Sequence, residues 1–331
     1  MTAPTTDVIA IGNAIVDVMA PCADELIEQL GLVRGGMTLV DTDQAHALYQ
    51  AMGPAREISG GSAANTLAGL AALGANCAFI GQVADDQLGE VFAHDIRAGG
   101  ISFATPARAG DPPTARCLIF VTPDGQRTMN TYLGASQYLP AAALDEEAIA
   151  DAAILYLEGY LWDPAEPRAA MRRAIAAAKN AGRKVAFTLS DAFVISRHGD
   201  DFRKLIAAGE IDILFANHVE LAALTGLDDF EAGIAALAPK LPLLVVTCGE
   251  KGAVALSGDE RADVPAEPVA KVVDTTGAGD LFAAGFLAGH VKQRPLAECL
   301  TMGAVAAAEV ISHYGARPEA DLKALMAARL G

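Results

Sequence analysis

The sequence predicts an α/β fold, in which a doubly wound, mainly parallel sheet carries a small antiparallel β lid. Two observations lead to this prediction. Short apolar runs alternate with helix-like segments, a pattern typical of parallel strands that are buried on both faces. A separate pair of apolar runs is joined by a Pro-Asp-Gly turn, which is typical of a β-hairpin.

The predicted parallel strands share a short apolar run that ends at small or polar residues. They are Val8–Gly12, Ala78–Val83, Ile154–Glu158, Val185–Leu189, Ile211–Ala216 and Leu243–Cys248. The predicted helices between them are Asn65–Leu73, Pro164–Ala181, Val219–Leu224 and Phe230–Leu237. From Asp274 to Gly331 we expect a chain of helices. This alternation indicates βαβ units, with helices on both faces of the sheet.

The lid is predicted from two segments that break the alternation. Gly31–Asp41 follows the first strand too closely to be a crossover helix, and Thr114–Leu133 contains two strands around Pro123-Asp124-Gly125. Ligands bind at the carboxyl ends of strands in open α/β sheets, so a flap over that edge is the expected place for these strands. A surface elaboration without function is the alternative. We therefore assign residues 1–17, 46–105 and 136–331 to the α/β domain, and residues 18–45 and 106–135 to the lid.

Composition restricts the class of protein. The chain has 331 residues, of which 52% are hydrophobic, so an intrinsically disordered chain is excluded. Its formal net charge of −17 at pH 7 repels nucleic acid and anionic membranes, and we expect neither as a partner. A phosphate site in so acidic a protein has to be built locally from backbone N–H groups, a metal ion or a few cations.

Cysteine usage and the N-terminal residues indicate a cytoplasmic protein. The five cysteines are scattered without a C-x-x-C pair, which favours free thiols over disulfides or a zinc site. Met1–Thr6 is short and polar, so we expect no signal peptide. Ile58–Ala84 has no charged residue, but its glycines favour a loop, a helix and a buried strand over a membrane span. The sequence leaves open whether the protein is a monomer or a homodimer.

The segment Asp274-Thr275-Thr276-Gly277-Ala278-Gly279-Asp280 joins an irregular stretch to a helix that we predict to begin near Gly279. Its small residues let successive backbone N–H groups point outward at a helix N-terminus, where the helix dipole favours an anion. Asp280 can then accept a proton from an attacking hydroxyl while these N–H groups hold a phosphoryl group. A helix cap is the alternative role for Asp280.

Four further polar clusters follow predicted strands or open predicted helices, where ligands bind in α/β folds. They are Gly60-Gly61-Ser62-Ala63-Ala64-Asn65, Asn13 with Asp17, Asn217 with Glu220, and Thr247-Cys248-Gly249-Glu250-Lys251-Gly252. Glycines permit a ligand to approach the backbone, oxygen ligands suit hydrated Mg²⁺, and the last turn suits nucleotide phosphates. Close helix packing, a turn and a helix cap are the structural alternatives. Neither a P-loop nor a dinucleotide-binding glycine motif occurs.

In this order, the motifs resemble those of the ribokinase-like (PfkB) family of carbohydrate and nucleoside kinases. DTTGAGD is similar to the C-terminal signature of that family, and GGSAANTLAGLAALG with GQVADDQLG is similar to the N-terminal one. The resemblance covers essentially the whole chain. It implies an ATP- and Mg²⁺-dependent phosphotransferase with an alcohol group as acceptor, and a doubly wound α/β domain with a small β lid.

The resemblance also implies roles for single residues. Asp280 would be the catalytic base, and the anion hole would come from Gly277, Ala278 and Gly279. Asn217 and Glu220 would organise Mg²⁺ and the ATP phosphates, largely through water. The ATP-binding turn would be formed by Thr247, Gly249 and Gly252. Those that would bind the ribose hydroxyls are Asp17, Gly61 and Asn65. Glu158 is similar to a further active-site carboxylate, with a plain strand-end residue as the alternative. Asp274 fits a loop that binds a monovalent cation, commonly K⁺.

Two features resemble the adenosine kinase branch of the family. In IGNAIVD, Asn13 precedes Asp17 by four residues, and Arg127 in GQRTMNTYLGAS is similar to a lid arginine that approaches the phosphates. They imply phosphorylation of the 5′-hydroxyl of a nucleoside, adenosine first. A sugar kinase (ribokinase, fructokinase or 2-keto-3-deoxygluconate kinase) and a non-catalytic nucleoside-binding protein are the alternatives. No aromatic side chain is assigned to stack on the base.

Overall fold

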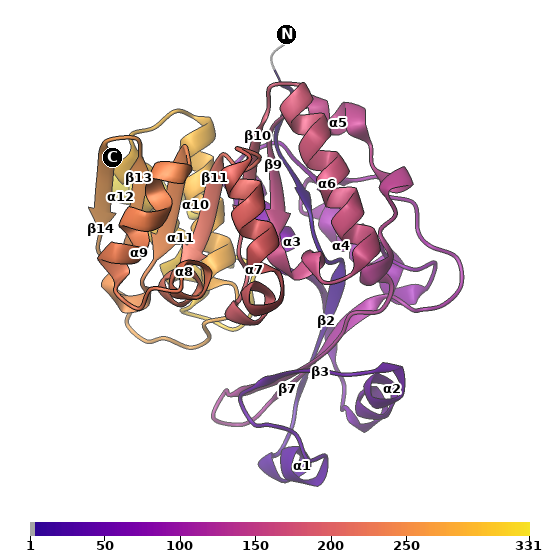
Figure 1. Ribbon diagram of the computed structural model, residues 1–331. Coiled ribbons are helices and arrows are strands. Elements are labelled where there is room, and N and C mark those ends of the chain that lie inside the picture. The colour runs from indigo at the N-terminus through magenta and orange to yellow at the C-terminus, as the bar shows by residue number, and fades with distance from the viewer. Residues whose placement is uncertain (1–3) are drawn as a thin grey trace.

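The computed structural model describes residues 4–331, so Met1–Ala3, which we assigned to the α/β domain and to a polar N-terminal segment, lie outside the described residues. The chain forms a nine-stranded sheet and a five-stranded sheet that projects from it (Figure 1). The strand order in the large sheet is β14-β13-β12-β11-β10-β9-β1-β5-β6. The predicted α/β class with a small β lid is confirmed.

Seven strands of the large sheet are parallel, and all six predicted strands are among them with ends shifted by a few residues. The parallel strands are β1 (Thr6–Ile11), β5 (Cys77–Ile80), β6 (Ile101–Phe103), β9 (Ala152–Glu158), β10 (Lys184–Thr188), β11 (Ile213–Asn217) and β12 (Leu243–Thr247). The antiparallel edge is formed by β13 (Ala253–Ser257) and β14 (Glu260–Val264). The short β6 and this edge hairpin were not predicted.

Helices cover both faces of the large sheet, because alternate residues of each strand point to opposite faces. In β1, Val8 and Ala10 pack with one set of helices, and Ile9 and Ile11 pack with the other. The first set is α3 (Ser62–Ala72), α4 (Gln87–Ala98), α10 (Ala278–Val291), α11 (Leu296–Val310) and α12 (Leu322–Leu330). The second set is α5 (Glu146–Asp151), α6 (Ala165–Asn180), α7 (Ala192–Ala207), α8 (His218–Thr225) and α9 (Phe230–Leu237).

The α/β domain also contains several short 3-10 helices. The 3-10 helices are Gly134–Tyr138, Ala141–Ala143, Gly159–Trp162, Ala238–Lys240 and Gly249–Lys251. Within residues 4–331 no helix has both the length and the apolar character that crossing a membrane requires.

The smaller sheet has the order β3-β8-β7-β2-β4 and lies below the large sheet in Figure 1. Its strands are β2 (Ile15–Pro21), β3 (Met37–Leu39), β4 (Arg56–Gly60), β7 (Ala115–Val121) and β8 (Arg127–Tyr132). The predicted hairpin of β7 and β8 is present, and β2 and β4 are also antiparallel, whereas β2–β7 and β3–β8 are parallel. Our boundaries placed Arg56–Gly60 in the α/β domain, but this segment is a lid strand because it pairs with Ile15–Met19.

The two faces of the lid sheet differ in what they contact. Val18, Leu118 and Phe120 belong to the same core cluster as Ile27 of α1 (Asp24–Gln29) and the buried residues of α2 (Thr42–Ala51). The alternate residues, such as Ile119, line a cavity on the other face. The lid therefore presents one face to its own helices and the other to the large domain.

Candidate active site

The site lies where the strand order of the large sheet changes direction. From β1 the chain proceeds to β5 on one side and later to β9 on the other, so the carboxyl ends of β1 and β9 flank a topological switch point. A cavity of about 760 Å³ opens there, under the lid. It is lined by most of the residues that the sequence singled out: Asn13, Asp17, Gly61, Asn65, Glu158, Asn217, Glu220, Thr247, Gly277, Ala278, Gly279 and Asp280.

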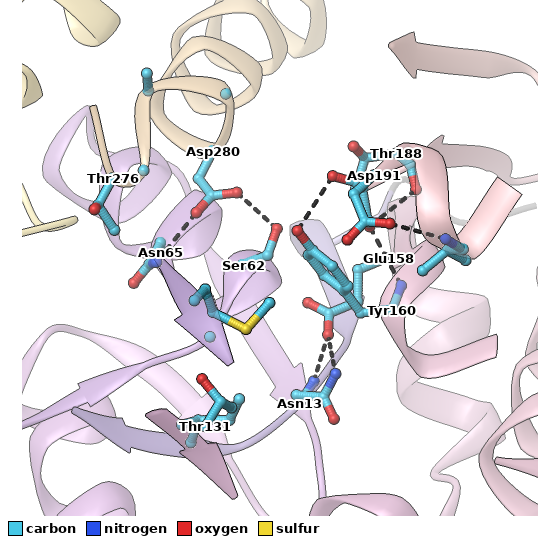
Figure 2. A pocket seen from close by; sticks show the side chains of 18 of the residues that line it. Asn13, Ser62, Asn65, Thr131, Glu158, Tyr160, Thr188, Asp191, Thr276 and Asp280 are labelled. Carbon is cyan, nitrogen blue, oxygen red and sulfur yellow. Dashed lines mark hydrogen bonds between the residues drawn. The ribbon is translucent and has the colours of Figure 1, made fainter. Parts of the chain in front are cut away.

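Asp280 lies in the first turn of α10, directly beside the N-terminal turn of α3 (Figure 2). Ser62 Oγ donates to its Oδ1 at 2.6 Å, and Asn65 Nδ2 donates to its Oδ2 at 3.1 Å. Burial raises the pKa of Asp280, and these two hydrogen bonds oppose the rise. A carboxylate with a raised pKa is a better proton acceptor near neutral pH, which suits a general base.

The backbone before Asp280 is shaped by Gly277. Its φ of 79° lies in the left-handed region, and a Cβ there would lie 2.7 Å from Cβ of Ala316, so only glycine fits. α10 begins directly after it, at Ala278. The backbone nitrogen of Ala278 donates to the carbonyl oxygen of Thr275 at 3.2 Å. The helix dipole and the N–H groups of a helix's first turn make such an N-terminus a suitable place for an anion.

Glu158 ends β9 and is fully buried, yet its carboxylate reaches the cavity wall. Asn13 donates to Oε1 from its backbone nitrogen at 2.8 Å and from Nδ2 at 2.7 Å, and the backbone nitrogen of Ala63 donates to Oε2 at 2.8 Å (Figure 2). Burial raises the pKa of Glu158 to about 7, although these hydrogen bonds act in the opposite direction. Glu158 therefore ties the ends of β1 and β9 to the start of α3.

Asp17 projects from β2 into the same cavity, and Gly60 of the paired strand β4 makes room for it. A Cβ on Gly60 would lie 2.6 Å from Oδ2 of Asp17, so Gly60 lies behind the carboxylate and does not line the cavity. Burial raises the pKa of Asp17 to about 6. Asn13, two residues before β2 begins, accepts a hydrogen bond from Ser136 Oγ at 2.8 Å.

Asn217 and Glu220 form a reciprocal capping box at the start of α8. Asn217 Oδ1 accepts from the backbone nitrogen of Glu220 at 2.8 Å, and Glu220 Oε2 accepts from that of Asn217 at 3.0 Å. Burial raises the pKa of Glu220 to about 7. Among residues 4–331 no group of three or more His, Cys, Asp or Glu side chains could hold a metal ion. The carboxylate lines the cavity with lone pairs to spare, which fits Mg²⁺ held through water.

The turn after β12 is only partly at the cavity. Thr247 lines it, whereas Gly249 and Gly252 do not. A Cβ on Gly252 would lie 2.0 Å from the carbonyl oxygen of Val264, so this glycine is required by the contact with the end of β14. Gly249 is exposed, with open space beside it.

Arg127 and Asp274 do not line the cavity. They form an ion pair with Arg127 Nη1 2.7 Å from Asp274 Oδ2. Gly315 donates to the same oxygen at 3.1 Å, and Thr276 donates to Oδ1 from its backbone nitrogen and its hydroxyl, at 3.0 and 2.7 Å. With a guanidinium and three other donors around it, this carboxylate does not fit a K⁺ ligand. Arg127 is held away from the cavity by the same contacts.

Several cavity residues had no role in the sequence analysis. The lid contributes an apolar wall of Ile15, Met37, Leu39, Ile119, Met129 and Leu133. Thr188, the last residue of β10, and Ser190 and Asp191, which follow this strand, also line the cavity. The strand-end rule that identified Asn13 and Asn217 would have found Ser190 and Asp191, since they are polar residues directly after the predicted strand Val185–Leu189. The apolar wall had no comparable signal, because its residues read as ordinary core positions.

Comparison with known proteins agrees with this arrangement. The family model described as pfkB family carbohydrate kinase matches residues 44–322. The chain belongs to this family. It is therefore a phosphotransferase that acts on an alcohol group, and kinases of this family use ATP.

Relatives within the family differ in their acceptors. A fructokinase-1 of Oryza sativa subsp. japonica is 34% identical over 243 residues, which is 71% of this chain and 74% of the relative. An adenosine kinase structure from Sinorhizobium meliloti is 49% identical, with a TM-score of 0.89 and 98% of each chain covered. A probable sugar kinase structure from Rhizobium etli CFN 42 is 44% identical, with a TM-score of 0.91, covering 98% of this kinase and 99% of that chain.

Proposed function

We propose that this kinase transfers the γ-phosphoryl group of ATP to the 5′-hydroxyl of a nucleoside, adenosine first. In this proposal Asp280 accepts the proton of the hydroxyl as its oxygen bonds to phosphorus, and the bond to the β-phosphate oxygen breaks to release ADP. The N–H groups of Gly277, Ala278 and Gly279 hold the transferring phosphoryl group, whose charge is spread over its oxygens. Asn217 and Glu220 would hold Mg²⁺ through water, and the ion would supply positive charge at the phosphates.

The ribose is bound by side chains that have hydrogen-bonding capacity left. Asn65 uses its Nδ2 on Asp280, while its buried Oδ1 has no hydrogen-bond partner within the described part of the chain. A buried acceptor without a partner is costly, and a substrate hydroxyl would satisfy it. Asp17 offers a carboxylate from the lid strand β2 to the same cavity. Together they suit a pair of adjacent sugar hydroxyls.

The apolar lid wall is the observation that favours a nucleoside over a free sugar. Ile119 and Met129 face the cavity from neighbouring strands, and Met37 and Leu39 extend the same surface to the lid edge. A free sugar presents hydroxyls on all sides and would leave them unpaired against these side chains. A flat nucleobase gains from the same contact, because apolar pockets with few polar groups suit aromatic ligands. The adenosine kinase relative from Sinorhizobium meliloti is consistent with this preference.

A sugar kinase is the second candidate, and the Oryza sativa fructokinase is the relative that favours it. ADP release should be measured over a panel of adenosine, guanosine, inosine, cytidine, ribose, fructose and 2-keto-3-deoxygluconate at saturating ATP and Mg²⁺. We expect the highest kcat/KM with adenosine. Turnover with hexoses alone would exclude the nucleoside proposal, and binding of adenosine without product would favour a non-catalytic binding protein.

We also propose a cytoplasmic location. All five cysteines are free thiols, and Cys77, Cys117 and Cys299 are buried, as is usual in proteins of reducing compartments.

A further inference from the structure

Arg317 lies between α11 and α12, and no motif in the sequence pointed to it. Its Nη2 donates to the carbonyl oxygen of Ser59 at 2.8 Å and to Ser59 Oγ at 3.0 Å. Ser59 is a buried residue of β4 that pairs with Val16 of β2, directly before Asp17. The guanidinium therefore lies against the strand pair that carries Asp17.

The residues just before Arg317 contact the loop that precedes Asp280. The backbone nitrogen of Gly315 donates to Asp274 Oδ2 at 3.1 Å. Ala316 occupies the space beside Gly277, where a Cβ would lie 2.7 Å from its own Cβ. Arg317 thus follows two residues that are fixed to the anion-binding loop.

The residues just after Arg317 are fixed to α11. The backbone nitrogens of Glu319 and Ala320 both donate to Glu309 Oε1, each at 2.8 Å. Glu309 is buried in α11, and His313 Nε2 lies 3.0 Å from the same oxygen. Because the segment is fixed on both sides, Arg317 has a defined place between β4 and the start of α10.

Arg317 contacts Ser59 directly, and its positive charge acts on two cavity carboxylates, Asp17 and Asp280. Burial has the largest effect on the pKa of Asp17 and raises it, and the nearby carboxylates of Asp280 and Asp274 also raise it. The charge of Arg317 lowers this pKa, and it does so more than the charge of Arg127. Arg127 is already paired with Asp274, so its charge is largely compensated.

Asp280 depends on the same cation. Burial raises its pKa, and the effects that oppose this are the hydrogen bonds from Ser62 and Asn65 and the charge of Arg317. The Nε of Arg317 is buried and has no hydrogen-bond partner within the described residues, so this guanidinium is not saturated by protein contacts. Asp95, which accepts from Ser59, also acts on Arg317.

We infer that Arg317 is a positioning residue for phosphoryl transfer: its buried guanidinium, fixed between β4 and the anion-binding loop, keeps Asp17 and Asp280 ionised together. Two carboxylates in one cavity repel each other, and one of them would otherwise hold a proton. A protonated Asp280 cannot act as base, and a protonated Asp17 loses acceptor capacity for substrate hydroxyls. The inference rests on the proposed roles of these two carboxylates.

The test is the acid limb of kcat/KM against pH, which reports ionisations of the free enzyme. Arg317→Gln removes the charge, so we expect the acid limb to move to higher pH. Relative to wild type, kcat/KM should fall about 10-fold or more near pH 6 and recover near pH 9. Arg317→Lys keeps the charge but not the geometry of the two hydrogen bonds to Ser59, and its limb should stay near that of wild type. Arg108→Gln is the matched control, since Arg108 is also an arginine with a buried, unpartnered Nε but stacks on Tyr138.

A merely structural role would lower kcat/KM by the same factor at every pH, and that result would overturn the inference. An unmoved limb in Arg317→Gln, or a shifted limb in Arg317→Lys, would also overturn it. Should Arg317→Gln fail to fold, as judged by circular dichroism, the Arg317→Lys profile still decides. The pH profile is measured with whichever acceptor gives the highest turnover. Failure of the nucleoside proposal would therefore be seen in the substrate panel, and failure of the proposed role of Arg317 would be seen in the position of the acid limb.

Discussion

Arg127 of the lid and Asp274 of the α/β domain form a buried ion pair, with Nη1 and Oδ2 2.7 Å apart and side chains only 6% and 8% exposed. Arg127 begins β8, and Asp274 begins the loop that leads to Asp280. The same guanidinium lies 5.5 Å from the ring centre of Tyr314. The lid sheet is therefore attached to the anion-binding loop at one defined point.

Removing the cation of this pair should destabilise the protein. Arg127→Met leaves Asp274 as a buried charge without its partner, and such a change costs about 3–5 kcal/mol of the free energy of unfolding. Urea denaturation followed by circular dichroism measures it. Arg34→Met is the control, because Arg34 pairs with Asp24 and Asp124 while 44% exposed, and exposed pairs contribute about 0–1 kcal/mol.

The double variant Arg127→Met with Asp274→Asn separates loss of the pair from loss of packing. Without the carboxylate no charge is stranded, so the double variant should be more stable than Arg127→Met alone. Equal or lower stability of the double variant would show that the arginine acts through its contacts with Met19 and Tyr314 instead.

The carboxylate of Asp280 should matter for turnover far more than for ATP binding. Asp280→Asn keeps an acceptor for Ser62 but cannot take the proton of the acceptor hydroxyl, so kcat should fall by about 10²–10⁴-fold. Steady-state kinetics and calorimetric titration with ATP measure the two effects separately. Near-normal kcat in this variant would assign the proton to another group and leave Asp280 as a helix cap.

Much of the fold was predictable because each central strand is a continuous apolar run that only a doubly covered sheet accommodates. The lid hairpin was predictable because Pro123-Asp124-Gly125 has the composition of a turn. By contrast, β4 (Arg56–Gly60) has no pattern of its own and becomes a strand only by pairing with β2. The helix α7 was missed because Gly199 and its charged neighbours interrupt the apolar spacing, although Phe202 continues the buried face.

The residues of the candidate site also fall into those that the sequence predicted and those that it did not. Residues in strand-end or helix-start motifs, such as Asn13 and Asp280, were found because a motif fixes its own local geometry. Gly252 was assigned to ATP, but a sequence does not distinguish a glycine that admits a ligand from one that admits a neighbouring backbone. Arg317 was missed because its contact with Ser59 depends wholly on how the C-terminal segment packs against β4.

The apolar lid wall should set affinity for the nucleobase. Met129→Thr introduces a hydroxyl and removes volume opposite the base, so KM for adenosine should rise about 10-fold, whereas KM for ATP should not change. Met52→Thr is the matched control, because Met52 follows α2 and does not line the cavity. An unchanged KM for adenosine in Met129→Thr, or an equal rise in both variants, would show that this wall does not contact the substrate.

Buried carboxylates should make the ligand-free kinase lose stability as pH rises through neutrality. Burial raises the pKa of Glu158 to about 7 from 4.5, so between these values the folded protein binds a proton that the unfolded chain releases. This contribution to the free energy of unfolding is complete below pH 4.5 and is lost as pH rises through 7. Glu220 acts with the same sign in the same range, and Asp17 does so up to about pH 6.

His290 acts with the opposite sign, because burial lowers its pKa to about 4 from 6.5, and its effect is complete above pH 6.5. Urea denaturation from about pH 6.5 to about pH 8 therefore follows the buried carboxyl groups, and Glu158 and Glu220 should each cost about 1 kcal/mol over that interval. The Gln side chain of Glu158→Gln cannot ionise, so this variant should show a smaller decrease in the free energy of unfolding with pH than wild type, whatever its absolute stability. Glu28→Gln on the exposed side of α1 should keep the full slope. If Glu158→Gln retains the wild-type slope, Glu158 is already ionised in the folded kinase at pH 6.5.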